Sequence, residues 1–280
     1  MTPVPIRNRT RKNPIVQRKR NVIGFILAII VVIAASAYTL FATDAGRRLR
    51  RLIFGPPAPQ EVTEGLEDYV WHEEDAPTYV LASSPARIDW TLPENTVEYG
   101  ELDELGRATG VRAILNHTTV LEVQERREQE DADSKSEERL RIKPSGWGNN
   151  EQVDIVCPDG HVYLGWFWNR SHLLADSLGG EMRVENVICG TRMQNVGSNT
   201  EDEVGGMAWV ESEARIWLWH HSSGSLLFSA VPIYNGDDPV PLAVVVDMRS
   251  TDGEVDMHAI VFNAAKGYVI DYSTGDFERI

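Results

Sequence analysis

The chain has 280 residues, of which 42% are hydrophobic and 25% are charged. This composition excludes a largely disordered chain and allows one substantial globular domain with additional segments. The charge is unevenly distributed, because residues 1–51 contain 11 of the 27 Lys and Arg residues but only one acidic residue, Asp44. The remaining 16 basic and 41 acidic residues give the rest of the chain a net charge of about −25.

The N-terminal part predicts a segment directed to the membrane. Residues 1–21 are basic and polar, and we expect a disordered cytoplasmic tail. Residues 22–42 contain no charged side chain, and a helix of this length would span roughly 30 Å, the thickness of the hydrocarbon core of a bilayer. The surplus of basic residues before this segment favours a cytoplasmic N-terminus. A single-pass protein of the cell membrane, with an extracellular C-terminal domain, is therefore expected.

A cleavable signal peptide is the alternative for the same segment. Ala35-Ser36-Ala37 resembles a cleavage site behind an apolar core. Cleavage there would make the protein secreted, so both interpretations export the domain. Residues 43–86 then form a predicted stalk, in which residues 56–59 are a stiff proline-rich spacer.

The folded domain is expected to cover residues 87–280. Its first apolar strand is predicted at residues 111–115, and the charge run at 122–141 is typical of a solvated loop or helix face. Residues 160–168 are aromatic and β-branched, which predicts a strand. Apolar side chains recur every three or four positions in residues 206–221, which predicts a helix with one apolar face.

The C-terminal part predicts mainly strands, at residues 226–233, 242–248, 255–263 and 268–272. Ser250-Thr-Asp-Gly253 has the composition of a hairpin turn between two of them. The predicted fold class is therefore α+β, with a twisted antiparallel sheet and few helices.

Cys157 and Cys189 are the only cysteines. Outside the membrane two thiols can pair as a disulfide, and two buried thiols are the alternative. No C-x-x-C motif or cluster of His and Cys exists that would predict a zinc site.

Polar side chains gather in three stretches that could carry chemistry: residues 168–172, residues 186–195 and the start of the predicted helix at 206–221. Hydrolysis of a phosphodiester requires a base that takes a proton from water and cationic partners for the charge on phosphorus. His172 can serve as the base at neutral pH. Asn195 and Glu211 offer the oxygen atoms that suit Mg²⁺, and Arg170 can present its guanidinium to a phosphate. By spacing alone, a lone histidine after a strand is more often structural than catalytic.

The same stretches resemble the DNA/RNA non-specific endonucleases of the ββα-metal type, particularly the streptococcal DNA-entry nucleases. The signature of that family is Asp-Arg-Gly-His, followed by an Asn-bearing segment and a helix with Glu. Asn169-Arg170-Ser171-His172 stands at the signature here. The similarity continues over residues 87–278, most clearly at residues 99–107, 144–147, 173–175, 186–195, 206–211, 252–254 and 267–275.

The resemblance implies a ββα-metal nuclease core that binds Mg²⁺ or Mn²⁺ and cleaves DNA, with RNA as a further substrate. It implies that His172 is the general base and Asn195 the direct metal ligand. Asn186 and Glu211 would be supporting residues that orient the ion's waters or the backbone, and Arg170 would contact the scissile phosphate.

Two positions depart from the signature. Asn169 replaces its Asp and removes a negative charge, although the amide oxygen can still accept a hydrogen bond. Ser171 replaces its Gly, which requires ordinary backbone angles at this position. Neither change removes the base or the metal ligand, and we expect activity.

The acidic charge argues against tight, non-specific adhesion to nucleic acid. A local basic groove around Arg170, Arg183 and Arg192, or screening by divalent cations, would reconcile this charge with a nuclease. Two other functions stay open: a surface-binding module that keeps the fold without the activity, and a secreted nuclease toxin.

Several other polar and aromatic residues are expected to be structural. His220 and His221 are predicted at a helix end or on the surface, and His258 packed within a strand. Trp166 and Trp168 are expected in the core, and Asp247 and Asp271 on the exposed face of their strands.

Overall fold

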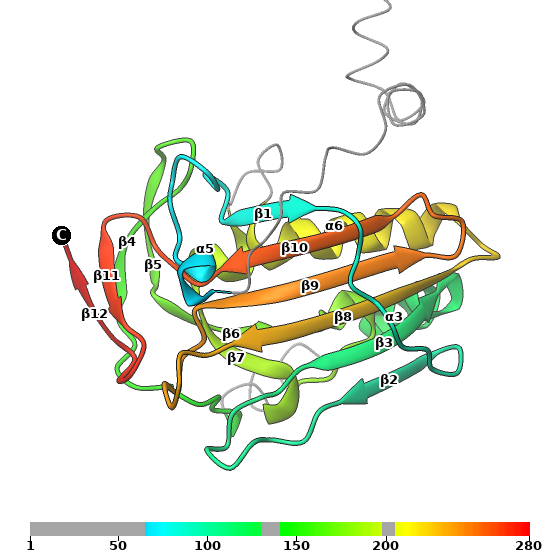
Figure 1. Cartoon of the computed structure of the whole chain (residues 1–280), viewed down its shortest axis with the longest axis horizontal. Coiled ribbons are helices and arrows are strands. Elements are labelled where there is room, and N and C mark those ends of the chain that lie inside the picture. Colours follow the sequence, from blue (N-terminus) through cyan, green and yellow to red (C-terminus); the bar gives the residue numbers. More distant parts are fainter. Residues whose placement is uncertain (1–64, 130–140, 198–204) are drawn as a thin grey trace, which may run out of the picture. The chain divides into compact units, whose positions relative to one another are not determined.

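A computed structural model describes residues 65–129, 141–197 and 205–280 (Figure 1). The predicted cytoplasmic tail, the predicted transmembrane or signal segment at 22–42 and the first part of the stalk lie outside the described residues. Within the described part, no helix has the length and apolar character needed to cross a membrane. All described residues belong to one compact unit, Pro59–Ile280.

A six-stranded antiparallel sheet organises this unit, in the spatial order β1-β10-β9-β8-β3-β2 (Figure 1). Four of its strands confirm the expected ones to within about two residues, and the turn expected at 250–253 joins β9 to β10. The strands are β1 (Val80–Ser83), β2 (Thr96–Tyr99), β3 (Val111–Asn116), β8 (Ser225–Ile233), β9 (Ala243–Ser250) and β10 (Asp256–Phe262).

The expected stalk does not extend to residue 86. A 3-10 helix, η1, covers Leu66–Tyr69, and β1 pairs with β10 at the edge of the sheet, with Val80 opposite Val261. Ala76 and Tyr79 are each 1% exposed. Sequence patterning misses this part because β1 has only four residues and follows an acidic stretch. The folded domain therefore begins before residue 87.

Two helices cover one face of the sheet, α3 (His117–Gln129) and α6 (Gly206–His220), and Figure 1 shows both behind the strands. The apolar face expected for α6 is confirmed, because its buried side chains join those of β3, β8, β9 and β10 in the largest core cluster. Burial of each large apolar side chain contributes about 1.5–3 kcal/mol. Within the charge run, residues 122–129 form a helix with a solvated face, while 130–140 lie outside the described residues.

Three two-stranded sheets accompany the main sheet. They pair β4 (Gln152–Val156) with β5 (Val162–Trp166), β6 (Trp168–His172) with β7 (Val187–Thr191), and β11 (Tyr268–Asp271) with β12 (Asp276–Arg279). A short helix, α5 (Arg192–Val196), follows β7 directly, and the 3-10 helices η2 (Asp176–Leu178) and η3 (Val184–Asn186) lie between β6 and β7.

The single strand expected at 160–168 is wrong. β5 ends at Trp166 and β6 begins at Trp168, and the two strands belong to different sheets. The polar stretch 168–172 is itself a strand, with His172 as its last residue. Its Asn, Arg, Ser and His side chains conceal the strand, because such residues do not form an apolar pattern of period two. Trp168 is buried as expected, but Trp166 is 54% exposed.

Candidate active site

The chain segment β6, β7 and α5 forms a strand, strand and helix unit that positions the candidate residues. In the antiparallel register Asn169 lies opposite Gly190 and His172 opposite Val187. Thr191 caps α5, since its Oγ1 accepts a hydrogen bond from Gln194 N at 2.9 Å. The same threonine donates to Ala264 O at 2.7 Å. These bonds fix the start of α5 beside β6.

Asn195, the expected metal ligand, lies on α5 beside Asn169. Its Nδ2 donates to Asn169 Oδ1 at 3.5 Å, and Arg192 Nη1 donates to the same oxygen at 3.5 Å. Arg192 is held in turn by a bond from its Nε to Tyr163 Oη at 2.8 Å. The amide nitrogen of Asn195 is thus directed to Asn169, which leaves its carbonyl oxygen as the atom suited to a hard cation.

His172, the expected base, is half-buried at the end of β6. Asn169 stands three residues earlier on the same strand, about 10 Å away at the rise of an extended chain, and is also partly exposed. The structure therefore places Asn169 and Asn195 together, with His172 farther along the strand that carries Asn169.

Asn186 fixes the backbone that follows His172. It is fully buried; its backbone oxygen accepts from Leu173 N, and its Oδ1 accepts from Leu174 N, both at 2.9 Å. Its Nδ2 donates to Leu174 O and to Glu181 O, also at 2.9 Å. Of the two supporting roles expected for Asn186, these bonds favour the orientation of the backbone.

Arg170 is partly engaged within the protein. Its guanidinium lies over the ring of Trp147, 4.2 Å from the ring centroid, and its Nε donates to Ile142 O at 2.5 Å. Burial lowers the pKa of this guanidinium, with a smaller opposite contribution from Cys189. A phosphate contact from Arg170 would therefore use its remaining N–H groups.

Ser171 occupies the place of the signature glycine without backbone strain. It lies within β6 and has no positive φ angle, and its side chain is fully buried. Gly190 makes room for it, because a Cβ at Gly190 would come within 2.7 Å of the Ser171 Cβ. The substitution at this position is thus compatible with the strand.

Glu211 lies in the second turn of α6. Burial raises its pKa to about 7, against smaller opposing effects of Arg215 and Arg127. Arg215 stands one turn later on the same helix, so its charge lies near the carboxylate.

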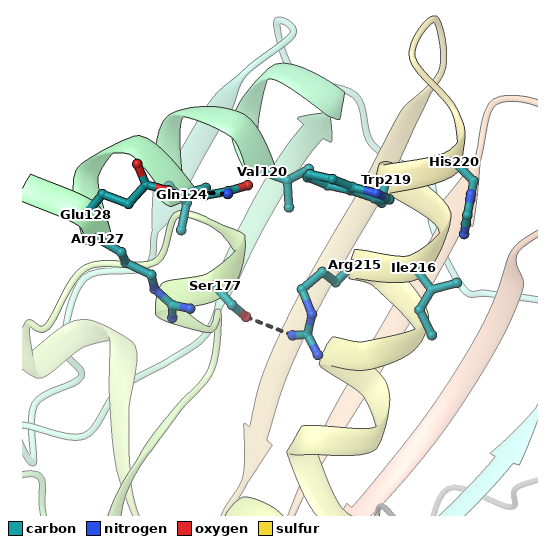
Figure 2. A pocket seen from close by; sticks show the side chains of 10 residues that line it. Val120, Gln124, Arg127, Glu128, Ser177, Arg215, Ile216, Trp219 and His220 are labelled. Carbon is teal, nitrogen blue, oxygen red and sulfur yellow. Dashed lines mark hydrogen bonds between the residues drawn. The ribbon is translucent and has the colours of Figure 1, made fainter. Parts of the chain in front are cut away.

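A groove between α3 and α6 adjoins this position, and we call it the α3–α6 groove. Its side chains include Val120, Gln124, Arg127, Ser177, Arg215 and Trp219 (Figure 2). Arg215 donates to Ser177 Oγ at 3.1 Å, and Arg127 forms an ion pair with Asp176 at 2.7 Å. Trp219 is 49% exposed. The groove therefore combines two guanidinium groups with an exposed aromatic ring.

The arginines of this groove are not those expected to form a basic groove, Arg170, Arg183 and Arg192. Arg183 Nε forms an ion pair with Glu185 at 2.9 Å, and Glu181 lies 3.6 Å from its Nη1, so its charge is compensated. The sequence does not predict a site role for Arg127 and Arg215, because charged residues on a helix are typical of a solvated surface. The only available signal is the spacing of four between Glu211 and Arg215.

The disulfide considered between Cys157 and Cys189 is not formed. Cys189 lies on β7 and packs with Phe167 and Trp168, whereas Cys157 follows β4 and packs with Tyr79 and other residues of a separate cluster. Both cysteines are buried, and burial raises the pKa of Cys189 well above its usual range. The second alternative, two buried thiols, is the one observed.

The remaining expectations concern structural residues. His258 is buried as expected, with its Nδ1 at 2.9 Å from Asp247 Oδ1. Asp247 is 7% exposed and also accepts from Arg87 N at 2.7 Å, so the exposed face expected for it is wrong. Asp271 is exposed, as expected.

The fold corresponds to that of streptococcal nucleases. Sda1 nuclease, solved with a bound zinc ion, superposes with a TM-score of 0.65 and 26% identity, covering 75% of this chain and 100% of that one. NucA from Streptococcus agalactiae, solved with magnesium bound, gives a TM-score of 0.56 and 21% identity, covering 85% of this chain and 99% of that one. The expected resemblance is thereby confirmed.

Sequence similarity to a characterised protein agrees with the structural similarity to nucleases. A protein named deoxyribonuclease from Streptococcus dysgalactiae subsp. equisimilis is 33% identical over 150 residues, which are 54% of this chain. The match spans 45% of the length of that protein, so its activity is transferred to this chain only as a proposal. No family model matches the chain.

Proposed function

We propose that this chain is a metal-dependent endonuclease that acts outside the cytoplasmic membrane and hydrolyses the phosphodiester bonds of DNA, with RNA as a further substrate. The observation that carries the proposal is the β6–β7–α5 unit, which holds Asn195 against Asn169 and has His172 at the end of β6. The similarity to Sda1 nuclease and to the streptococcal deoxyribonuclease supports it.

The donor atoms fit a hard divalent cation. The Asn195 amide oxygen is a neutral oxygen ligand, and the Glu211 carboxylate can hold the waters that Mg²⁺ retains. Such an ion, Mg²⁺ or Mn²⁺, would supply positive charge that stabilises the leaving oxygen. The half-buried Glu211 is suited to this neighbour, because a cation favours its ionised form.

The protein's own residues perform the proton transfer and the binding. The imidazole of His172 accepts a proton from the attacking water, which is efficient because its ordinary pKa lies near neutrality. The bonds of Asn186 to Leu173 and Leu174 hold the backbone next to that ring. Arg170, and Arg127 and Arg215 in the α3–α6 groove, offer N–H groups to the phosphates of the substrate.

Cleavage of supercoiled plasmid by the purified full chain in Mg²⁺ tests the proposal. We expect His172→Ala to lower the rate at least about 100-fold and EDTA to abolish it. His72→Ala is the matched control, because His72 is exposed between η1 and β1, and it should cleave like the wild type. Plasmid left equally intact by the wild type and by His172→Ala across Mg²⁺ and Mn²⁺ would reject the nuclease function, and equal cleavage by the two proteins would reject His172 as the base.

A binding module without activity is the second candidate. Asn169 in place of the signature aspartate and the acidic charge of the domain favour it. Plasmid left intact by the wild type, together with retarded migration of DNA in a gel, would support this function over hydrolysis.

The extracellular location is a separate part of the proposal and is supported by the apolar segment 22–42 and its basic flanks. Proteolysis of intact cells should degrade the domain if it is anchored outside. The mass of the mature N-terminus distinguishes an anchor from a cleaved signal. Protection of the domain until the cells are lysed would contradict export.

A further inference from the structure

Three side chains that bind metals in other proteins converge at the end of α6 remote from Glu211. His221 follows the last residue of α6, and Asp252 and Glu254 belong to the turn between β9 and β10. Their ligand atoms all lie within 4.8 Å of one another. The ten residues from Glu211 to His221 correspond to about 15 Å along a helix, so this cluster is separate from the candidate nuclease site.

The imidazole of His221 is oriented as in a metal ligand. Its Nδ1 lies 2.8 Å from the backbone oxygen of Trp217, and a carbonyl can only accept, so Nδ1 carries the hydrogen. The lone pair of the neutral ring is then on Nε2, which faces the two carboxylates. Donation of the second ring N–H to a backbone carbonyl is the usual support of a metal-bound histidine. The ring also stacks on Trp217 at 4.6 Å and 6°.

The distances suit one small ion. Nε2 lies 3.5 Å from Asp252 Oδ2 and 3.2 Å from Glu254 Oε2. Two ligands bound to a tetrahedral zinc ion at about 2.0–2.1 Å are roughly 3.4 Å apart. Both separations from Nε2 are thus close to those that such an ion requires, and the carboxylate oxygens lie within 4.8 Å of each other.

The turn that carries the carboxylates is internally fixed. Oδ1 of Asp252 accepts from Ser250 Oγ at 2.6 Å and from Glu254 N at 3.0 Å, which leaves Oδ2 directed to His221. Burial acts to raise the pKa of Asp252, but these bonds, His221 and the Trp217 indole together lower it.

A buried donor, the indole of Trp217, lies beside one carboxylate of the cluster. Trp217 is 5% exposed, and within the described residues its Nε1 has no hydrogen-bond partner of good geometry. It nevertheless acts on the Asp252 carboxyl. The indole N–H is therefore placed to support Asp252 as a ligand.

We propose that His221, Asp252 and Glu254 bind one divalent transition-metal ion of the Zn²⁺ type, with water as the fourth ligand. An imidazole with two carboxylates favours such an ion over Mg²⁺, which prefers oxygen ligands only. The ion joins the end of α6 to the β9–β10 turn and stabilises the fold. This site does not depend on the proposed nuclease activity.

Zinc chloride titration of the purified full chain tests the site, with bound zinc measured by elemental analysis after gel filtration. Asn195→Ala serves as the parent, so that the candidate nuclease site does not contribute. We expect one zinc ion per parent chain, and at least a tenfold loss of affinity when His221→Asn or Glu254→Gln is added. Glu278→Gln, at an exposed position on β12, should bind zinc like the parent.

Thermal unfolding provides a second measurement. Zinc should raise the melting temperature of the parent and leave that of the Glu254→Gln variant unchanged, while circular dichroism in EDTA shows that both are folded. Glu254→Gln keeps the bond between His221 and Trp217, so it stays informative if His221→Asn does not fold. Equal zinc content in the parent and in the Glu254→Gln variant, or no zinc bound by the parent, would overturn the site.

Discussion

The side chain of Asn186 forms two hydrogen bonds with the backbone of one residue, Leu174. Leu174 N donates to Asn186 Oδ1 and Asn186 Nδ2 donates to Leu174 O, each at 2.9 Å. Leu174 lies two residues after His172, so this pair of bonds determines the course of the chain as it leaves β6. Because the Asn186 amide is fully buried, these two hydrogen bonds hold the backbone of Leu174 rigidly.

Replacement of Asn186 by Ala should lower both stability and activity. The change leaves the buried backbone groups of Leu174 without partners, and we expect a loss of about 3 kcal/mol in the free energy of unfolding. Asn186→Asp keeps the oxygen that accepts from Leu174 N but loses the amide that donates to Leu174 O. This variant should therefore also have a lower free energy of unfolding, because the donor is missing. Urea unfolding gives the free energies, and plasmid cleavage by the folded fraction gives the activity. An Ala variant as stable as the wild type would show that these bonds do not matter.

Asn169→Asp should strengthen the candidate metal site. A carboxylate would make charge-assisted bonds to Arg192 and a better acceptor for Asn195, both of which lie 3.5 Å from Oδ1. We expect a lower Mg²⁺ concentration at half-maximal cleavage and a rate several-fold higher. Asn169→Leu, with the same branching and no acceptor, should have the opposite effect. Identical Mg²⁺ dependence of cleavage in all three proteins would show that residue 169 has no influence on metal binding.

The fold was predictable where hydrophobic patterning is regular and unpredictable where polar residues form structure. The strands β8, β9 and β10 and the helix α6 are rich in apolar residues that pack against one core. β6 was missed because Asn169, Arg170 and His172 are polar and only partly buried, so no apolar pattern of period two marks the strand. The clustering of His221 with Asp252 and Glu254 was also hidden, because it depends on two elements meeting across about 30 positions of sequence.

The candidate site was predictable in part for a similar reason. The signature resemblance located Asn169, His172 and Asn195 on one strand, strand and helix unit. Their separations, the unformed disulfide and the groove arginines depend on tertiary distances that residue spacing does not encode. Asp247 shows the same limit, since its alternation in β9 suggested exposure whereas His258 and the Arg87 backbone bury it.

Glu211 should make the stability of the apo protein depend on pH. Burial raises the pKa of Glu211 from 4.5, the value of an unperturbed glutamate, to about 7 in the folded chain. The folded state therefore prefers the neutral acid. The proton on Glu211 therefore contributes to the free energy of unfolding fully below pH 4.5. This contribution, about 3 kcal/mol, is lost as the pH rises through 7. Glu211→Gln should therefore be more stable than the wild type at pH 8 and similar near pH 4.5. Urea unfolding in EDTA measures this, with Glu278→Gln as the exposed control; parallel pH curves would refute it.

The α3–α6 groove should contribute to substrate binding through its charge. Arg127 pairs with Asp176 yet remains 47% exposed, so one face of its guanidinium can still meet a phosphate. We expect Arg127→Ala to raise KM several-fold with little change in kcat, and to reduce the slope of log affinity against log salt by about one. Arg279→Ala is the matched control, because Arg279 is also exposed and paired with an acid, Asp154, but lies on β12. If both variants shift KM and the salt slope equally, the effect comes from net charge and the groove has no special part in binding. If only Arg127→Ala does so, an acidic domain binds nucleic acid through a local basic surface, which its overall charge conceals.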